Sequence, residues 1–69
     1  MIKMSIGKKI RSRREELGMT QDELAERIGV TQAMVAMIEK ERKLPGVTLF
    51  ADIAHELDTT MDALADKSA

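Results

Sequence analysis

The sequence predicts an all-α fold, a compact bundle of five helices in one domain over residues 1–69. The chain is long enough for one small core, but too short for an enzyme with a separate cofactor domain. Its core must be built mainly from Leu, Ile, Val, Met and Ala, because Phe50 is the single aromatic residue, and this composition favours helices. The absence of cysteine excludes disulfides and Cys-based zinc sites, so helix packing must supply the stability.

The first predicted helix spans about residues 6–17. Ser5 can cap its start, and Gly18 can end it as a C-terminal glycine. The apolar residues at helical spacing are Ile6, Ile10 and Leu17.

The second predicted helix begins with a capping box. The Thr20 hydroxyl can accept a hydrogen bond from the amide of Glu23, and the Glu23 carboxylate can accept one from the amide of Thr20. Gly29 ends this helix. Its buried stripe consists of Leu24, Ala25 and Ile28.

Thr31 caps a third predicted helix that runs to about Arg42. The turn before it, which contains Gly29 and Val30, is too short for the two helices to lie antiparallel. Two short helices joined in this way cross steeply, so about residues 20–42 are predicted to form a helix-turn-helix.

Pro45 separates the third helix from a fourth, predicted over about residues 47–57, because proline removes a backbone donor and biases the preceding residue to extended conformations. Thr60 then caps a short last helix that points Met61 and Leu64 inward. The fourth helix is expected to bury Val47, Phe50, Ile53, Ala54 and Leu57.

Charge is nearly balanced overall, with 11 Lys and Arg against 12 Asp and Glu, but it is unevenly distributed. The basic residues of segments 1–14 and 31–46 predict one positive face, as a nucleic-acid partner requires: Lys3, Lys8, Lys9, Arg11, Arg13, Arg14, Lys40, Arg42 and Lys43. Acidic residues near the C-terminus predict a solvated flank away from that face: Asp52, Glu56, Asp58, Asp62 and Asp66. A surface of mixed charge is the alternative interpretation.

The sequence gives little support for an enzyme. His55 is the only histidine and has no serine, cysteine or second histidine at a plausible spacing, so we expect it on the surface. We expect no cofactor, no metal and no small-molecule substrate. No apolar run approaches the length of a membrane span, and residues 1–4 do not open a signal peptide, so we expect no membrane partner and a cytoplasmic location.

The segment TQDELAERIGVTQAMVAMIEKERKLP, residues 20–45, resembles the helix-turn-helix of the phage repressor, Cro and XRE family of bacterial regulators. IGKKIRSRREELGMT is similar to the first helix of that family, and VTLFADIAHELDTTMDAL to its fourth and fifth helices, so the resemblance covers nearly the whole chain. It implies a lambda repressor-like domain whose third helix enters the DNA major groove. It also implies a structural ion pair between Arg14 and Glu39, which agrees with the need of an arginine in an apolar stripe for a partner.

The third helix is expected to carry a buried and a DNA-facing side. Val35 and Ile38 define the inward side at about 100° per residue. Gln32 lies in the first turn, where its amide can bond both N6 and N7 of an adenine. Gln21, in the first turn of the second helix, is expected to hold a phosphate oxygen. The full predicted DNA-binding set is Gln21, Thr31, Gln32, Ala33, Ala36, Met37, Lys40, Arg42 and Lys43.

Two features depart from the family pattern. The third helix offers apolar residues where polar ones are usual, so contact with thymine methyl groups and DNA shape would supply part of the specificity. These residues are Ala33, Ala36 and Met37. Glu41 stands where the family usually has glycine, and we expect it to extend the helix by a turn and to place a repelling charge near the phosphates.

These observations predict sequence-specific binding to double-stranded DNA, most simply by a transcriptional repressor without catalytic activity. An engineered DNA binder on this scaffold would have the same features. Family members usually bind as dimers, and a homodimer is left open here. The alternative is a protein-interaction module of the antitoxin or antirepressor type that uses the apolar face of the third helix.

Overall fold

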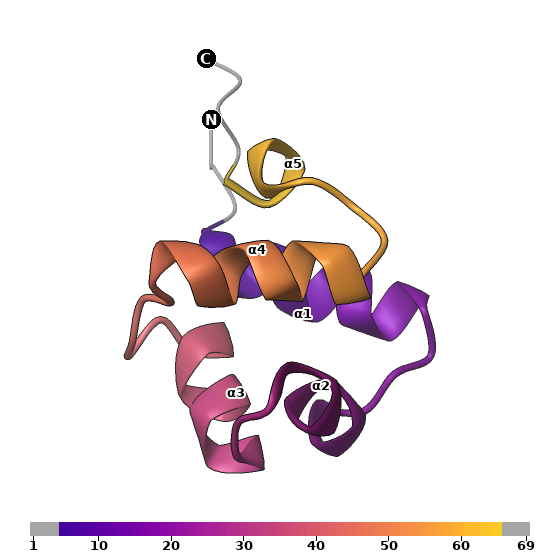
Figure 1. Ribbon diagram of the computed structural model, residues 1–69, viewed down its shortest axis with the longest axis vertical. Helices are drawn as coiled ribbons and strands as arrows, with labels where there is room; N and C mark the ends of the chain where they lie inside the picture. Colours follow the sequence, from indigo (N-terminus) through magenta and orange to yellow (C-terminus); the bar gives the residue numbers. More distant parts are fainter. Residues whose placement is uncertain (1–4, 66–69) are drawn as a thin grey trace.

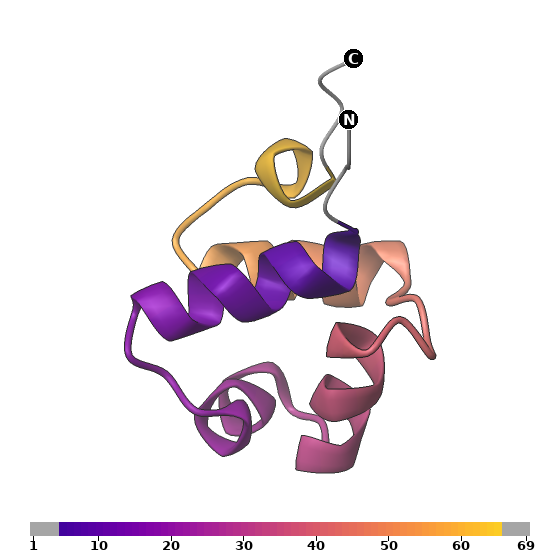
Figure 2. The ribbon, with the colours of Figure 1, turned by 180° about the vertical axis from the view of Figure 1, so that it is seen from behind.

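The computed structural model describes residues 5–65, and over this range the fold consists of five α-helices. In chain order they are α1 (Ile6–Glu16), α2 (Gln21–Ile28), α3 (Gln32–Glu39), α4 (Val47–Glu56) and α5 (Met61–Ala65). Figure 1 shows α1 and α4 across the middle, α2 and α3 on one side of them and α5 on the other, and Figure 2 shows the same order from behind. The predicted five-helix, all-α architecture is therefore confirmed for the described part of the chain.

One hydrophobic core receives side chains from every helix. Its buried members are Ile10, Leu24, Ala25, Val35, Ile38, Ile53, Ala54, Leu57 and Leu64. Phe50 is half-buried and packs against this core. Helices of 5 to 11 residues are marginal alone in water, so the shared core and the helix caps stabilise them together.

Threonine caps begin three of the helices where the sequence predicts them. The Thr20 hydroxyl accepts from the Glu23 amide at 3.0 Å, and the Glu23 carboxylate accepts from the Thr20 amide at 2.8 Å. The hydroxyls of Thr31 and Thr60 accept from amides three residues later, at 3.2 and 3.1 Å. The capping box and both threonine caps are thus confirmed.

The helix ends are set by residues in the left-handed backbone region. Gly18 and Gly29 end α1 and α2 with φ values of 68° and 75°, as predicted. The predicted end of the third helix at about Arg42 is wrong, because α3 ends at Glu39. Glu41 does not extend the helix as expected, since its φ of 65° turns the chain out of it.

The expected burial of Val47 and Met61 is wrong, whereas Ser5 is the N-cap residue of α1 as predicted but lacks a side-chain bond, and Leu17 keeps its helical spacing but is not buried. Val47 and Met61, each the first residue of a helix, are 79% and 39% exposed. Helical side chains lean toward the N-terminus, so a side chain in the first turn extends beyond the packed body. Leu17 is 42% exposed, because Arg14 takes the buried position at the end of α1.

Residues 1–4 and 66–69 lie outside the described range. The expectations for residues 1–4, which include Lys3, and for Asp66 therefore concern positions that the structure does not describe. That the whole of residues 1–69 forms one domain stays a prediction for the same reason. Within residues 5–65, no helix is both long enough and apolar enough to cross a membrane.

Candidate nucleic-acid interface

Helices α2 and α3 form a helix-turn-helix at one edge of the molecule (Figure 1). After Gly29 turns the chain, the amide of Val30 donates to the carbonyl of Ala25 at 3.0 Å, which closes the C-terminus of α2. The half-buried Val30 side chain packs against the core. Thr31 then caps α3, so a turn of few residues fixes the direction in which α3 projects.

The two sides of α3 differ sharply in exposure. Val35 and Ile38 are 1% and 2% exposed and anchor α3 in the core. The opposite side, here called the outer strip of α3, consists of the exposed residues Gln32, Ala33, Met37 and Lys40. Ala36 and Met34 are half-buried between the two sides, and Thr31 is exposed at the helix start. The outer strip is therefore available to a partner and is not sealed within the core.

A polar network links the helix-turn-helix to α1; it consists of Arg14, Glu39, Gln21 and Gln32. The Arg14 guanidinium donates to both carboxylate oxygens of Glu39, at 2.7 and 3.0 Å, and to the carbonyl of Met19 at 2.7 Å. Arg14 and Glu39 are 7% and 6% exposed. The Gln21 amide donates to Glu39 at 3.0 Å, and the Gln32 amide donates to Gln21 Oε1 at 2.7 Å.

Glu39 fixes the orientation of both glutamines. An ionised carboxylate only accepts hydrogen bonds, so Gln21 must turn its NH₂ group to Glu39 and its oxygen to Gln32. Gln32 therefore turns its NH₂ group to Gln21. The hydrogen bonds to Glu39 are the main cause that raises the pKa of Arg14 above its ordinary value, so the guanidinium and the carboxylate form a charged pair.

Basic side chains follow α3 in a tight turn, here called the basic turn, residues 40–43. The amide of Glu41 donates to the carbonyl of Ile38 at 3.1 Å, and the amide of Arg42 donates to the carbonyl of Met37 at 2.9 Å. This pair of bonds is a Schellman motif. The predicted phosphate-binding residues in the turn, Lys40, Arg42 and Lys43, are all exposed.

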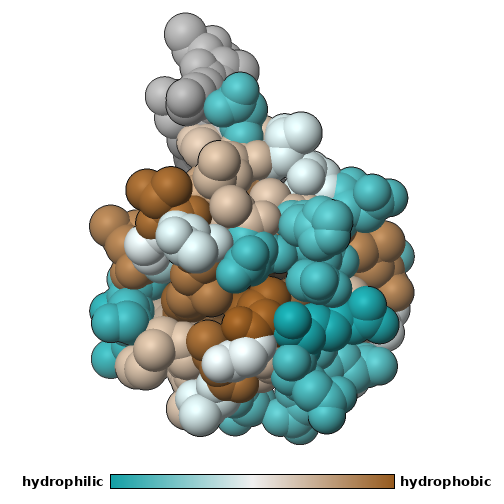
Figure 3. Space-filling view, in the orientation of Figure 1, coloured by the Kyte–Doolittle hydropathy of each residue, from teal (hydrophilic) through white to brown (hydrophobic). Residues whose placement is uncertain are grey.

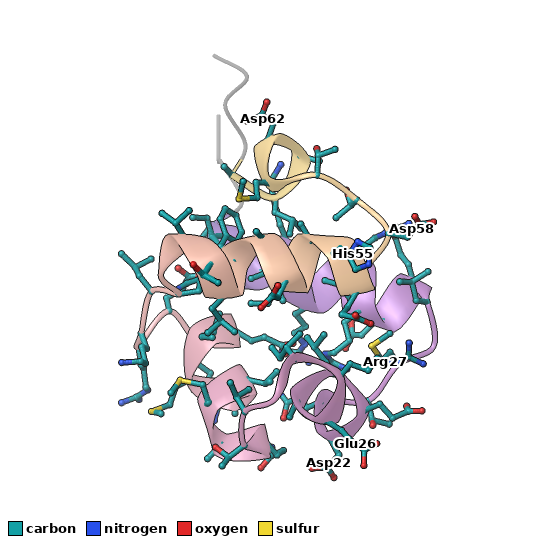
Figure 4. All side chains as sticks on the ribbon, in the orientation of Figure 1. Asp22, Glu26, Arg27, His55, Asp58 and Asp62 are labelled. Atoms are coloured by element: carbon teal, nitrogen blue, oxygen red, sulfur yellow. The ribbon has the colours of Figure 1, made fainter. Side chains whose placement is uncertain are left out.

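Acidic residues and the one histidine lie on the surfaces of three helices. Asp22 and Glu26 project from α2, Asp62 projects from α5, and His55 lies on the surface of α4 near Asp58 (Figure 4). Hydrophobic surface is visible around the junction of α3 and α4 (Figure 3). The most exposed apolar residues at that junction are Leu44 and Val47, at 72% and 79%.

Sequence reasoning missed two connections of this site. One is the double role of Gln21, which bonds Glu39 and Gln32; an exposed-looking glutamine in a first turn gives no local sign of either partner. The other is the contact of Gly7 with the end of α3, where a Cβ would lie 2.8 Å from the carbonyl oxygen of Glu39. A glycine inside a helix, with no turn to make, is a signal of such close approach.

Comparison with known proteins gives the same architecture. The model of a protein family described as helix-turn-helix matches residues 10–64. An uncharacterized HTH-type transcriptional regulator of Methanothermobacter thermautotrophicus is 50% identical over 48 residues, which cover 70% of each chain.

Two solved structures with bound DNA share the fold. The P22 c2 repressor in complex with a synthetic operator has a TM-score of 0.89 at 23% identity, over 96% of this chain and all of that one. The biofilm master regulator SinR in complex with DNA has a TM-score of 0.80 at 30% identity, over 86% of this chain and 95% of that one. With a family match across most of its length, the chain belongs to the helix-turn-helix family of the phage repressor and XRE type.

Proposed function

We propose that this protein binds double-stranded DNA sequence-specifically through α3 and regulates transcription, most simply as a repressor. The observation that carries the proposal is the exposed outer strip of α3, which lies opposite the buried Val35 and Ile38. An eight-residue helix is about 12 Å long and, with its side chains, about as wide as the major groove of B-DNA. Relatives and solved structures of transcriptional regulators support the same assignment.

Gln32 is the proposed base-reading residue. One N–H of its amide donates to Gln21, which leaves a second N–H and the carbonyl oxygen for a base. These two groups match the N7 acceptor and the N6 donor of adenine. Because Glu39 fixes Gln21, and Gln21 fixes Gln32, the reading amide is oriented before DNA arrives. Ala33 and Met37 supply apolar contact for thymine methyl groups.

Phosphate contacts are proposed on both sides of α3. The capping box uses the amides of Thr20 and Glu23, which leaves the amides of Gln21 and Asp22 at the N-terminus of α2 without a helical partner. Such amides, with the positive end of the helix dipole, suit a phosphate oxygen. The basic turn supplies positive charge on the other side.

A homodimer on a palindromic site, absence of catalysis and a cytoplasmic location remain predictions.

Two substitutions test the division of roles. We expect Gln32→Ala to lower the preference at one base position by about 1 to 3 kcal/mol, because it removes a direct base contact. Arg42→Ala should weaken all duplexes alike and lower the slope of log K against log salt by about one, because it removes a phosphate contact. Selection from randomised duplexes, followed by fluorescence anisotropy at several salt concentrations, measures both.

Arg27→Ala is the matched control for Arg42→Ala. It removes the same charge from the far end of α2, where Arg27 lies 3.7 Å from Glu56, on the side away from α3 (Figure 4). The control should leave the salt slope unchanged. No binding to any duplex at low salt, or binding without salt dependence, would contradict the proposed function and favour a protein partner for the apolar residues of α3.

A further inference from the structure

Glu41 holds a backbone conformation that ordinarily favours glycine. Its φ of 65° lies in the left-handed region, where a Cβ crowds the backbone. A glycine would complete the Schellman motif after α3 without that cost. The conformational cost of a glutamate at this position must therefore be offset by the contacts of its side chain.

The carboxylate of Glu41 lies against Gly7 in the first turn of α1. A Cβ built on Gly7 would collide with Glu41 Oε2, so the carboxylate occupies the place of the missing side chain. Since the Cα–Cβ direction tilts toward the N-terminus of a helix, this place lies beside the start of α1. The absence of a side chain at Gly7 is what allows the carboxylate to reach the helix.

Within residues 5–65, the N-terminus of α1 has no side-chain cap of its own. Its first turn contains no acidic residue, and the side chain of Ser5, the N-cap residue, makes no capping bond. The Ser5 hydroxyl oxygen is buried and has no hydrogen-bond partner within the described residues. The positive end of the α1 dipole is therefore left to be balanced by groups from elsewhere in the chain.

The end of α3 meets the start of α1 at the same point. The carbonyl oxygens of Ile38 and Glu39 also crowd the place where a Gly7 side chain would be. The negative end of one helix dipole thus faces the positive end of the other, and the Glu41 carboxylate adds a full negative charge to this junction.

We propose that Glu41 is a positioning residue for DNA binding: its carboxylate caps α1 from the outside and so holds the basic turn against α1. The inference rests on the proposed function. Because the carboxylate of Glu41 points toward Gly7, it faces α1. The cationic side chains of Lys40, Arg42 and Lys43 can then bind phosphates. The negative charge of Glu41, which the sequence analysis expects to repel DNA, thereby stabilises the fold.

Glu41→Gln tests the cap, because it keeps the size of the side chain and removes its charge. Glu41→Gln should lower Tm by about 2 to 6 °C relative to the wild type, and this difference in Tm should become smaller at high salt. In a ¹H–¹⁵N spectrum, the amide resonance of Gly7 should move. The matched control Glu26→Gln removes an exposed carboxylate from α2 and should leave the Gly7 resonance in place and Tm within about 1 °C.

Ser5→Asp provides the second arm of the test. The backbone of Ser5, with φ −72° and ψ 166°, is extended as an N-cap requires, so an aspartate can cap α1 locally. Ser5→Asp should therefore raise the Tm of the Glu41→Gln variant more than that of the wild type. Equal effects in both backgrounds would show that Glu41 does not cap α1.

DNA binding tests the positioning role. Well below Tm, Glu41→Gln should weaken binding about 2- to 10-fold with an unchanged salt slope. Glu41→Gly relieves the left-handed backbone, so it should stay folded, and it should weaken binding in the same way. Tighter binding with a steeper slope would overturn the inference, because it would place the carboxylate at the phosphates; unchanged affinity would overturn the positioning role. The proposed function itself fails if the wild type does not bind DNA, or binds it without salt dependence, whatever the Glu41 variants do.

Discussion

Loss of the Glu39 carboxylate should remove a large part of the stability of this domain. In Glu39→Ala, the Arg14 guanidinium keeps its bond to the Met19 carbonyl but loses both bonds to Glu39, in a place where Arg14 is only 7% exposed. Breaking a buried ion pair by removing one partner costs about 3 to 5 kcal/mol. A chain of this length has a total unfolding free energy of about 3.5 to 10 kcal/mol.

The expected decrease in Tm is about 12 to 40 °C, since 1 kcal/mol shifts Tm by about 4 to 8 °C in a domain of this size. Circular dichroism during thermal and urea denaturation measures it. Replacing both partners, as in Arg14→Met with Glu39→Leu, should recover most of the loss, because no unpaired charge remains. That double variant should still bind DNA poorly, since Gln21 loses the acceptor that orients it and Gln32.

Two results would refute this reasoning. A loss of less than about 1 kcal/mol in Glu39→Ala would mean that Arg14 finds water or another acceptor, so that the pair is not effectively buried. A double variant no more stable than Glu39→Ala would mean that the cost comes from packing and not from an unpaired charge.

The other predictions concern α1 and the capping box. Gly7→Ala should lower the unfolding free energy by about 1 to 3 kcal/mol, because the added Cβ would collide with backbone carbonyls of α3. The control Lys8→Ala, at an exposed position in the same turn, should change the unfolding free energy little. Urea titration of both variants measures the difference. The bonds from Thr20 lower the pKa of Glu23 from its ordinary value of 4.5, so the capping box stabilises the fold fully above that value and less as pH falls through the depressed one. The Tm of the wild type should therefore exceed that of Glu23→Gln at neutral pH, and the difference should close in strong acid, while an equal difference at all pH values would contradict the assignment.

Helix boundaries set by short-range chemistry were predictable from the sequence. The caps at Thr20, Thr31 and Thr60 each involve an amide three residues later, so the sequence contains both partners side by side. The left-handed turns at Gly18 and Gly29 are equally local, because glycine alone adopts that region without cost. The order of five helices follows from these signals and the apolar spacing between them.

Residues whose surroundings come from distant parts of the chain were not predictable. Periodicity places Val47, Met61 and Leu17 on buried faces, but it cannot show where neighbouring helices stop covering them. Glu41 was expected to extend α3, because nothing near it in sequence indicates that its carboxylate meets Gly7. In the candidate site, the position of Gln32 in the first turn follows from local spacing, whereas its bond to Gln21 depends on how α2 and α3 cross.

The separation of buried and exposed residues on α3 has a consequence for how the DNA sequence preference of such a protein can change. Ala33 and Met37 are exposed and lie outside both the core and the polar network, so replacing them should alter folding free energy by no more than about 0.5 kcal/mol. Under the proposed mode of binding, the same replacements change which bases are preferred. New operators can then be acquired one substitution at a time while the scaffold stays intact, and a library randomised at positions 33 and 37 would sample specificities among molecules that nearly all fold.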